Sequence, residues 1–193
     1  MKDLRALSLT PPWPWAILRC GKRIENRLKW KSCAYRGTVF LHASGLPGPV
    51  ATWWRRTQSD PLYTPTERQS DELDDFTGIV TDSYSNATAA GIVAGAVTMH
   101  ELCSMAGHIV GAFDIIGVVR ESGTVVQDSP GPSFTLNIQR PLSDVERLWW
   151  MGGFALLLDN VREFEKPIPC KGALGLWRVP ADVVGQVELA YRG

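Results

Sequence analysis

The chain has 193 residues, of which 45% are hydrophobic and 21% charged, and 20 basic side chains balance 20 acidic ones. This length supports a hydrophobic core near the upper end of single-domain size, so we expect one domain over residues 1–193. A net charge of zero argues against a DNA-coating protein, which usually carries a basic surplus. The sequence has no apolar run of about 20 residues and no signal-peptide pattern at its start, so we expect a cytoplasmic protein outside the membrane.

The first third of the chain predicts two strands around a short helix. Residues 7–9 suggest a strand, and Thr10 then caps a helix whose prolines are tolerated because the N–H groups of a first turn have no acceptor in the helix. Gly21 ends this helix in a left-handed conformation. Residues 22–27 read as extended chain, and residues 37–43 are β-rich and predict a core strand.

Residues of about 50–90 read as an insertion between β-rich stretches. They are rich in Thr, Ser, Asp and Pro, and their apolar residues show helical spacing that starts near Thr66. A segment of this length without a place in the sheet is better explained as a lid or packing element than as a linker. Residues 91–105 fit a helix or a strand equally well.

The rest of the chain is predicted to be mostly strands. Residues 108–119 are rich in β-branched side chains and favour a buried strand, and residues 133–138 predict another. Ser143 opens a short helix with a capping box. Residues 154–161 and 173–179 supply two last strands. Strands without a repeating β-α-β alternation predict a mainly β, α+β fold, a small barrel with short flanking helices and one helical insertion.

Charge is segregated along this neutral chain. Residues 19–36 carry seven basic side chains against one acid, and residues 60–82 carry seven acids against one base. Separated blocks of this kind mark either a ligand-facing and a solvent-facing side or two solvated surfaces. The four cysteines, Cys20, Cys33, Cys103 and Cys170, form no CxxC pair, so we expect free thiols, no metal site and no cofactor.

Lys22, Glu25 and Arg27 are the strongest candidates for a site. In an extended segment Glu25 and Arg27 share a face, and Lys22 reaches it from the preceding turn. The set offers an acceptor, a planar five-donor cation and a lysine whose pKa falls on burial. In a binder, Arg27 would hold a phosphate or base edge. In a hydrolase, Lys22 and Glu25 would be catalytic, with Arg27 on the oxyanion. Alternatively, Glu25 and Arg27 form only a structural ion pair.

Other polar and aromatic residues are candidate ligand contacts. Trp13 is expected at the cleft edge, where it could stack on a base, and Trp15 in the core. His42 and Ser44 end a strand that should reach the same mouth, although a lone histidine there also fits a core or rim role. Asp114 lies within an apolar strand and needs a partner, which Arg27 or Lys22 could provide at the floor of the site; its alternative is an outward-facing position.

Several segments together resemble the ASCH family. They are residues 7–18 (LSLTPPWPWAIL), 21–27 (GKRIENR), 35–37 (YRG), 41–44 (LHAS), 109–111 (IVG) and 167–177 (PIPCKGALGLW). The resemblance covers both ends and the middle of the chain in the family's order and leaves residues 50–90 unexplained. It implies a PUA-like small β-barrel of the kind associated with RNA and modified nucleosides.

The resemblance leaves activity open. Some members resemble amidohydrolases that act on acetylated cytidine, and others have been considered nucleases. In the amidohydrolase-like members the position that matches Glu25 is a threonine, so the carboxylate here departs from their pattern. Three hypotheses follow. The first is binding of RNA or a modified nucleoside or nucleotide; the second is a small hydrolase, an amidohydrolase or ribonuclease, using Lys22 and Glu25. The third is a protein-interaction domain that uses Trp53 and Trp54 of the insertion.

Overall fold

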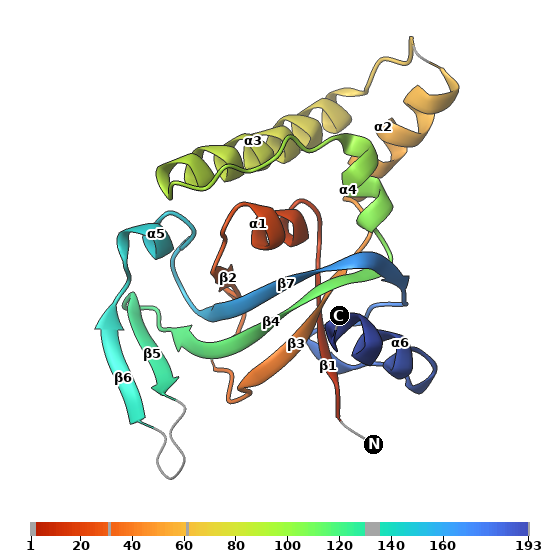
Figure 1. Cartoon of the computed structure of the whole chain (residues 1–193). Helices are drawn as coiled ribbons and strands as arrows, with labels where there is room; N and C mark the ends of the chain where they lie inside the picture. Colours follow the sequence, from red (N-terminus) through yellow and green to blue (C-terminus); the bar gives the residue numbers. More distant parts are fainter. Residues whose placement is uncertain (1–2, 31, 61, 130–135, 193) are drawn as a thin grey trace.

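A computed structural model describes residues 3–30, 32–60, 62–129 and 136–192, and it shows a mixed α+β fold built on one curled sheet (Figure 1). The strands are β1 (Arg5–Leu9), β2 (Ile24–Asn26), β3 (Gly37–Ala43), β4 (His108–Val119), β5 (Thr124–Ser129), β6 (Leu136–Pro141), β7 (Ala155–Pro169) and β8 (Leu176–Arg178). The helices are α1 (Trp13–Arg19), α2 (Gly48–Ser59), α3 (Glu67–Ala89), α4 (Met99–Met105), α5 (Asp144–Arg147) and α6 (Ala181–Arg192).

The main path of the sheet runs β2-β7-β4-β3-β1-β8. β1 and β3 run parallel, while the other paired strands of the described chain are antiparallel. β4 is long enough to change partner on one edge: β3 pairs with it up to Ile115, and β5 takes over from Gly117. The sheet therefore curls as a half-barrel, with the β5–β6 hairpin attached at one end (Figure 1).

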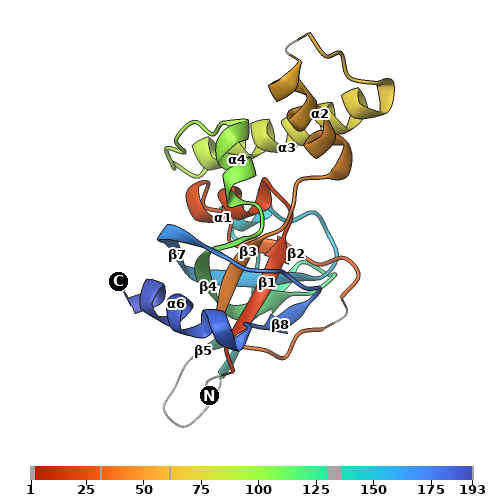
Figure 2. The same ribbon diagram turned by 90° about the vertical axis from the view of Figure 1, so that its right-hand side faces the viewer.

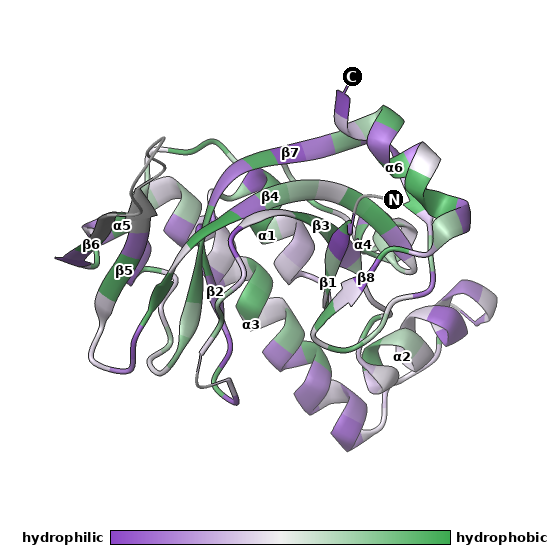
Figure 3. Ribbon diagram, turned by 90° about the horizontal axis from the view of Figure 1, so that it is seen from below, coloured by the Kyte–Doolittle hydropathy of each residue, from purple (hydrophilic) through white to green (hydrophobic). Residues whose placement is uncertain are grey.

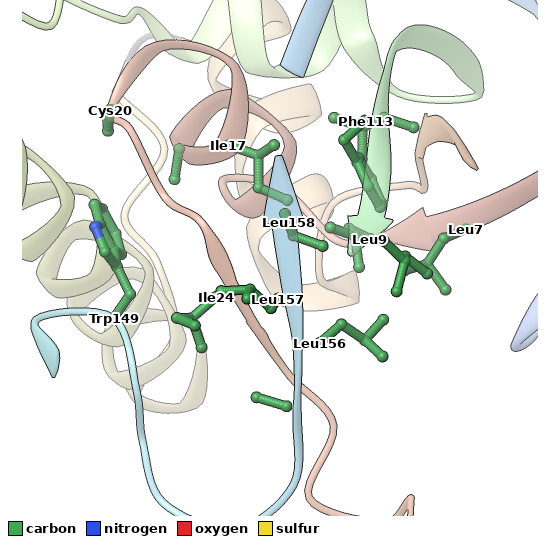
Figure 4. Packing of buried hydrophobic residues seen from close by; sticks show 14 of the residues in the cluster. Leu7, Leu9, Ile17, Cys20, Ile24, Phe113, Trp149, Leu156, Leu157 and Leu158 are labelled. Atoms are coloured by element: carbon green, nitrogen blue, oxygen red, sulfur yellow. The ribbon is translucent and has the colours of Figure 1, made fainter. Parts of the chain in front are cut away.

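Alternating side chains divide the core between the two faces of the sheet. On β3, Val39 and Leu41 join a large cluster with α1, whereas Phe40 points to a second cluster with α6. This alternation follows from the two-residue period of a strand. Figure 2 shows α1 and the insertion on one side of the sheet and α6 on a different side. Figure 4 shows the large cluster, in which Ile17 of α1 lies close to Leu158 of β7.

The insertion is helical and packs on α1. Thr66 forms a complete capping box with Gln69 and so starts α3. Phe76 is buried, and Tyr84 meets the ring of Trp15 edge-on with the centroids 5.0 Å apart. Figure 3 shows hydrophilic residues along the outer part of α3. The acidic segment therefore forms one solvated helix face, and the opposite face is tied to the core.

Most of the predicted elements are confirmed. The strand at residues 37–43 and the long strand at residues 108–119 have the expected bounds. The helix that starts after Thr66 and the capping box at Ser143 are also present. The α+β class and the curled, half-barrel sheet agree with the expected mainly β small barrel. Among the described residues, no helix is long and apolar enough to cross a membrane.

Other expectations at element boundaries need correction. Thr10 does not cap α1: Pro12 occupies the N-cap position without a side-chain cap, because the intervening prolines form a turn first. Residues 91–105 divide into a loop and then α4, which Thr98 caps. The expected strand at residues 133–138 lies partly outside the described residues, and β6 begins at Leu136.

The sequence analysis missed or shortened several elements. β5, α2 and α6 were not predicted, and β7 extends through Pro167 to Pro169 instead of ending near Val161. Pro167 is tolerated because it lies where the pairing of β7 with β4 shifts in register, between Glu163 and Ile168, and Pro169 is the last residue of the strand.

Candidate ligand-binding site

The turn between α1 and β2 positions the candidate residues. Gly21 has φ of 71°, the left-handed region that glycine adopts without strain, and it reverses the chain after α1. β2 then pairs antiparallel with β7, with Glu25 opposite Leu156. Because Ile24 points into the core, Glu25 points to the other side of the strand, as expected from the pleat. Lys22, in the turn between α1 and β2, is almost completely buried.

Lys22, Glu25 and Arg27 come together as predicted. The Lys22 Nζ lies 2.7 Å from Glu25 Oε2 and also donates to the carbonyl of Ile24. The Arg27 Nε lies 3.5 Å from Glu25 Oε1, at ion-pair distance without hydrogen-bond geometry. Lys22 is 1% exposed and Glu25 5%. Burial lowers the pKa of Lys22, and the adjacent Glu25 carboxylate offsets part of this effect.

These side chains line a pocket of about 380 Å³. Its other lining residues are Trp13, Asn26, Leu28, Lys29, Trp30 and Met151. Lys22 Nζ lies 5.2 Å from the centroid of the Trp13 ring, and Arg27 Cζ lies 5.3 Å from that of Trp30. Cations over aromatic faces are held in place by the ring quadrupole. The pocket thus combines three cations, one carboxylate and two indole rings.

Asn26 ties the far wall of the pocket to β2. Its Nδ2 donates to the carbonyl of Trp149 at 2.8 Å, and its Oδ1 accepts from the backbone N–H of Met151 at 2.9 Å. This pair of bonds holds the turn after α5 beside the site. As a result Met151, 60% exposed, and Leu28, 66% exposed, place apolar side chains at the pocket mouth.

His42 is not among the residues that line this pocket. It is buried, and its Nε2 donates to the carbonyl of Cys170 at 2.9 Å, while Nδ1 has no hydrogen-bond partner among the described residues. Burial lowers the pKa of His42. Its ring meets Trp177 edge-on, and Trp177 donates to Ser8, whose backbone carbonyl lies 3.5 Å from Arg27. His42 therefore lies behind the site and fits the core role.

Asp114 and Ser44 are also absent from the lining of the pocket. The expected pairing of Asp114 with Arg27 or Lys22 is wrong: its carboxylate accepts from the Thr38 hydroxyl at 2.7 Å and from Asn160 at 3.0 Å. The strand alternation turns it away from α1, so it finds partners on the neighbouring strands. Ser44 donates to the Thr10 hydroxyl at 3.3 Å.

The tryptophans of α1 divide as expected. Trp13 is half-buried and lines the pocket, whereas Trp15 is fully buried in the core. Five lining residues, Asn26, Leu28, Lys29, Trp30 and Met151, were not predicted. The basic block at residues 19–36 was a signal for Lys29 and Trp30, but Met151 is brought in by tertiary structure alone. Among the described residues, no three His, Cys, Asp or Glu side chains gather to hold a metal ion.

The structure thus shows an α+β fold with a basic, aromatic-edged pocket. A scan against protein-family models finds no match for the chain, and a search of curated proteins finds none either.

Proposed function

We propose that this chain is an ASCH-type, PUA-like domain that binds RNA or a nucleotide-like ligand in the pocket between Trp13 and Trp30. The observation that supports this best is the pairing of each ring with a cation, Lys22 over Trp13 and Arg27 over Trp30. A nucleotide needs both kinds of contact, a flat surface for its base and fixed donors for its phosphate or base edge. The ASCH resemblance points to the same ligand class.

The charges of the pocket favour an anionic or acceptor-rich ligand. Glu25 is engaged by Lys22 and lies near Arg27, so its charge is largely offset within the protein. Lys29 is exposed and makes no ion pair with a described residue. Stacking of one base on an indole contributes about 1–3 kcal/mol, and a hydrogen bond to a charged group about 1.5–3 kcal/mol. Both contacts would therefore contribute to the affinity for a nucleotide-like ligand.

Arg27→Ala tests this proposal. A thermal-shift screen against nucleosides, nucleotides and short RNAs should give a stabilising ligand, and titration of that ligand should be about 10- to 100-fold weaker with Arg27→Ala. Arg55→Ala, which removes an exposed arginine from α2, is the matched control and should bind as the wild type does. A screen without any stabilising ligand, or equal loss in both variants, contradicts the proposal.

A second candidate, a hydrolase, is favoured by the burial of Lys22. A neutral Lys22 amine could donate its two N–H groups to Ile24 and Glu25 and keep a lone pair to take a proton from water. The water oxygen would attack an amide carbonyl, Arg27 would steady the oxyanion, and the proton would return through Glu25 to the leaving amine. Burial lowers the Lys22 pKa in the direction that this role requires.

The hydrolase reading predicts turnover that depends on Lys22. Incubation of the protein with the ligands of the screen and with acetylated cytidine should release product, and Lys22→Met should abolish release while ligand binding persists. Binding without product from any of these compounds removes this candidate.

The interaction-domain hypothesis has less support, because Trp53 and Trp54 are both partly covered and contact each other with ring centroids 6.3 Å apart.

A further inference from the structure

A second pocket adjoins the basic one across two shared residues. It measures about 210 Å³, and Trp13 and Met151 line both pockets. Its remaining lining comes from α3 and from the turn at α5, namely Ile79, Asp82, Ser83, Asn86, Leu148 and Trp149. The insertion thus supplies one wall of a pocket that lies next to the basic one. A ligand seated between Trp13 and Trp30 can extend past Trp13 towards α3.

Asp82 is the available charge in this second pocket. It is exposed and makes no hydrogen bond or ion pair with any residue that the structure describes. Its polar neighbours are engaged within the protein, since the Ser83 hydroxyl donates to the Ile79 carbonyl at 2.8 Å and Asn86 donates to the Leu148 carbonyl at 2.9 Å. A lone carboxylate beside an apolar wall is complementary to a cation.

Trp149 adds a buried hydrogen-bond donor to the residues that line this pocket. The side chain is 2% exposed, and its indole N–H has no hydrogen-bond partner in the described part of the chain. A buried donor left unpaired costs about 1–3 kcal/mol. A ligand acceptor in this pocket would offset that cost after a small movement of the ring.

We propose that the ligand of this protein is a nucleoside or nucleotide with a cationic amine substituent, and that Asp82 binds the ammonium group. This inference rests on the proposed function, which places the nucleotide in the basic pocket. The first pocket is lined by Lys22, Arg27 and Lys29 against the single carboxylate of Glu25, whereas the charged residue that lines the second pocket is Asp82. A ligand with an anionic end and an ammonium end, joined by an apolar spacer, matches both.

A neighbouring nucleotide of an RNA fits the second pocket less well. The pocket is smaller than the roughly 300–1,000 Å³ of a typical small-molecule site, so it suits a substituent better than a second base and sugar. A phosphate there would also approach Asp82 and the acidic face of α3, where like charges repel. Both considerations favour a short amine-bearing chain.

The test uses UMP and CMP, their 5-aminoallyl derivatives, and the N-acetylated forms of those derivatives, in which the ammonium charge is removed. Isothermal titration with the full chain should show that the aminoallyl nucleotides bind about 10-fold more tightly than the parent and acetylated nucleotides. Asp82→Asn should abolish this gain and leave the parent affinities unchanged. Asp74→Asn removes another exposed acid of α3, about two turns before Asp82 and outside the lining of the pocket, and should keep the gain.

The outcomes separate this inference from the proposed function. If UMP or CMP binds and the amine brings no gain, or the gain survives in Asp82→Asn, the inference is overturned and the proposed function stands. Tighter binding of an unmodified dinucleotide that is insensitive to Asp82→Asn also overturns it, since the pocket would then hold a neighbouring nucleotide. If none of the six compounds binds the wild-type chain, the inference is overturned, and the proposed function is decided by the screen with the other nucleotides and short RNAs.

Discussion

Glu25→Ala should lower the free energy of unfolding by about 3–5 kcal/mol near neutral pH. The change removes the carboxylate that lies 2.7 Å from the Lys22 Nζ and leaves a cation that is 1% exposed without its counter-charge. The carbonyl of Ile24 remains as an acceptor, but a dipole offsets burial of a full charge only in part. Urea denaturation of both proteins measures the difference.

The loss should shrink as the pH rises. Burial lowers the pKa of Lys22 below the value of about 10.4 that it has in an unfolded chain. Between these two values the unfolded state binds more protons than the folded state, so stability increases with pH. Glu25→Ala removes the neighbour that raises the Lys22 pKa and so widens this window. The deficit should therefore be smaller near pH 9 than near pH 6.

Lys22→Met with Glu25→Ala is the control for this experiment. The double variant has no buried ammonium, so it should recover part of the lost stability and lack the pH dependence that Lys22 causes. A deficit below about 1 kcal/mol in Glu25→Ala, with no dependence on pH, would show that the pair behaves as a solvated surface ion pair.

Trp13→Ala should mainly weaken ligand binding and Trp15→Ala should mainly lower stability, although the two residues are only two positions apart in α1. Trp15 is fully buried and contacts Tyr84 of the insertion, so its removal should cost about 3–5 kcal/mol of stability. Trp13 lines both pockets, so its removal should weaken ligand binding by about 1–3 kcal/mol with a smaller effect on folding.

Denaturation and ligand titration of Trp13→Ala and Trp15→Ala separate the effect on stability from the effect on affinity, and Trp15→Phe serves as the control. Titration uses the ligand that stabilises the wild-type chain in the screen, at a temperature where both variants are folded. Trp15→Phe keeps most of the buried ring and should retain wild-type affinity. Equal losses of affinity in Trp13→Ala and Trp15→Phe would mean that the ligand does not stack on Trp13.

Much of the site could be predicted from local sequence. Lys22, Glu25 and Arg27 lie within six residues, and a turn at Gly21 followed by an extended strand is sufficient to place them together. The predictions for His42 and Asp114 rested on the ends and alternation of strands. These predictions put both residues at the site, but neither lines the pocket, because hydrogen bonds to Cys170 and Thr38 direct their side chains elsewhere.

The sequence by itself determined the elements with strong local signals. These include the β-branched strand at residues 108–119, the capping boxes at Thr66 and Ser143, and the cation-rich segment around Lys22. Each depends on residues within a few positions of one another. Periodicity, caps and charge are therefore readable without knowledge of the fold.

Tertiary structure alone decided which distant segments complete the site. Asn26 draws in Met151 through two hydrogen bonds across the fold, and α3 brings Asp82 to the other side of Trp13. No local pattern marks these residues, since their position depends on packing of the insertion against α1 through Trp15 and Tyr84. The curl of the sheet likewise arises from the exchange of β3 for β5 along β4, a long-range pairing that residue spacing does not encode.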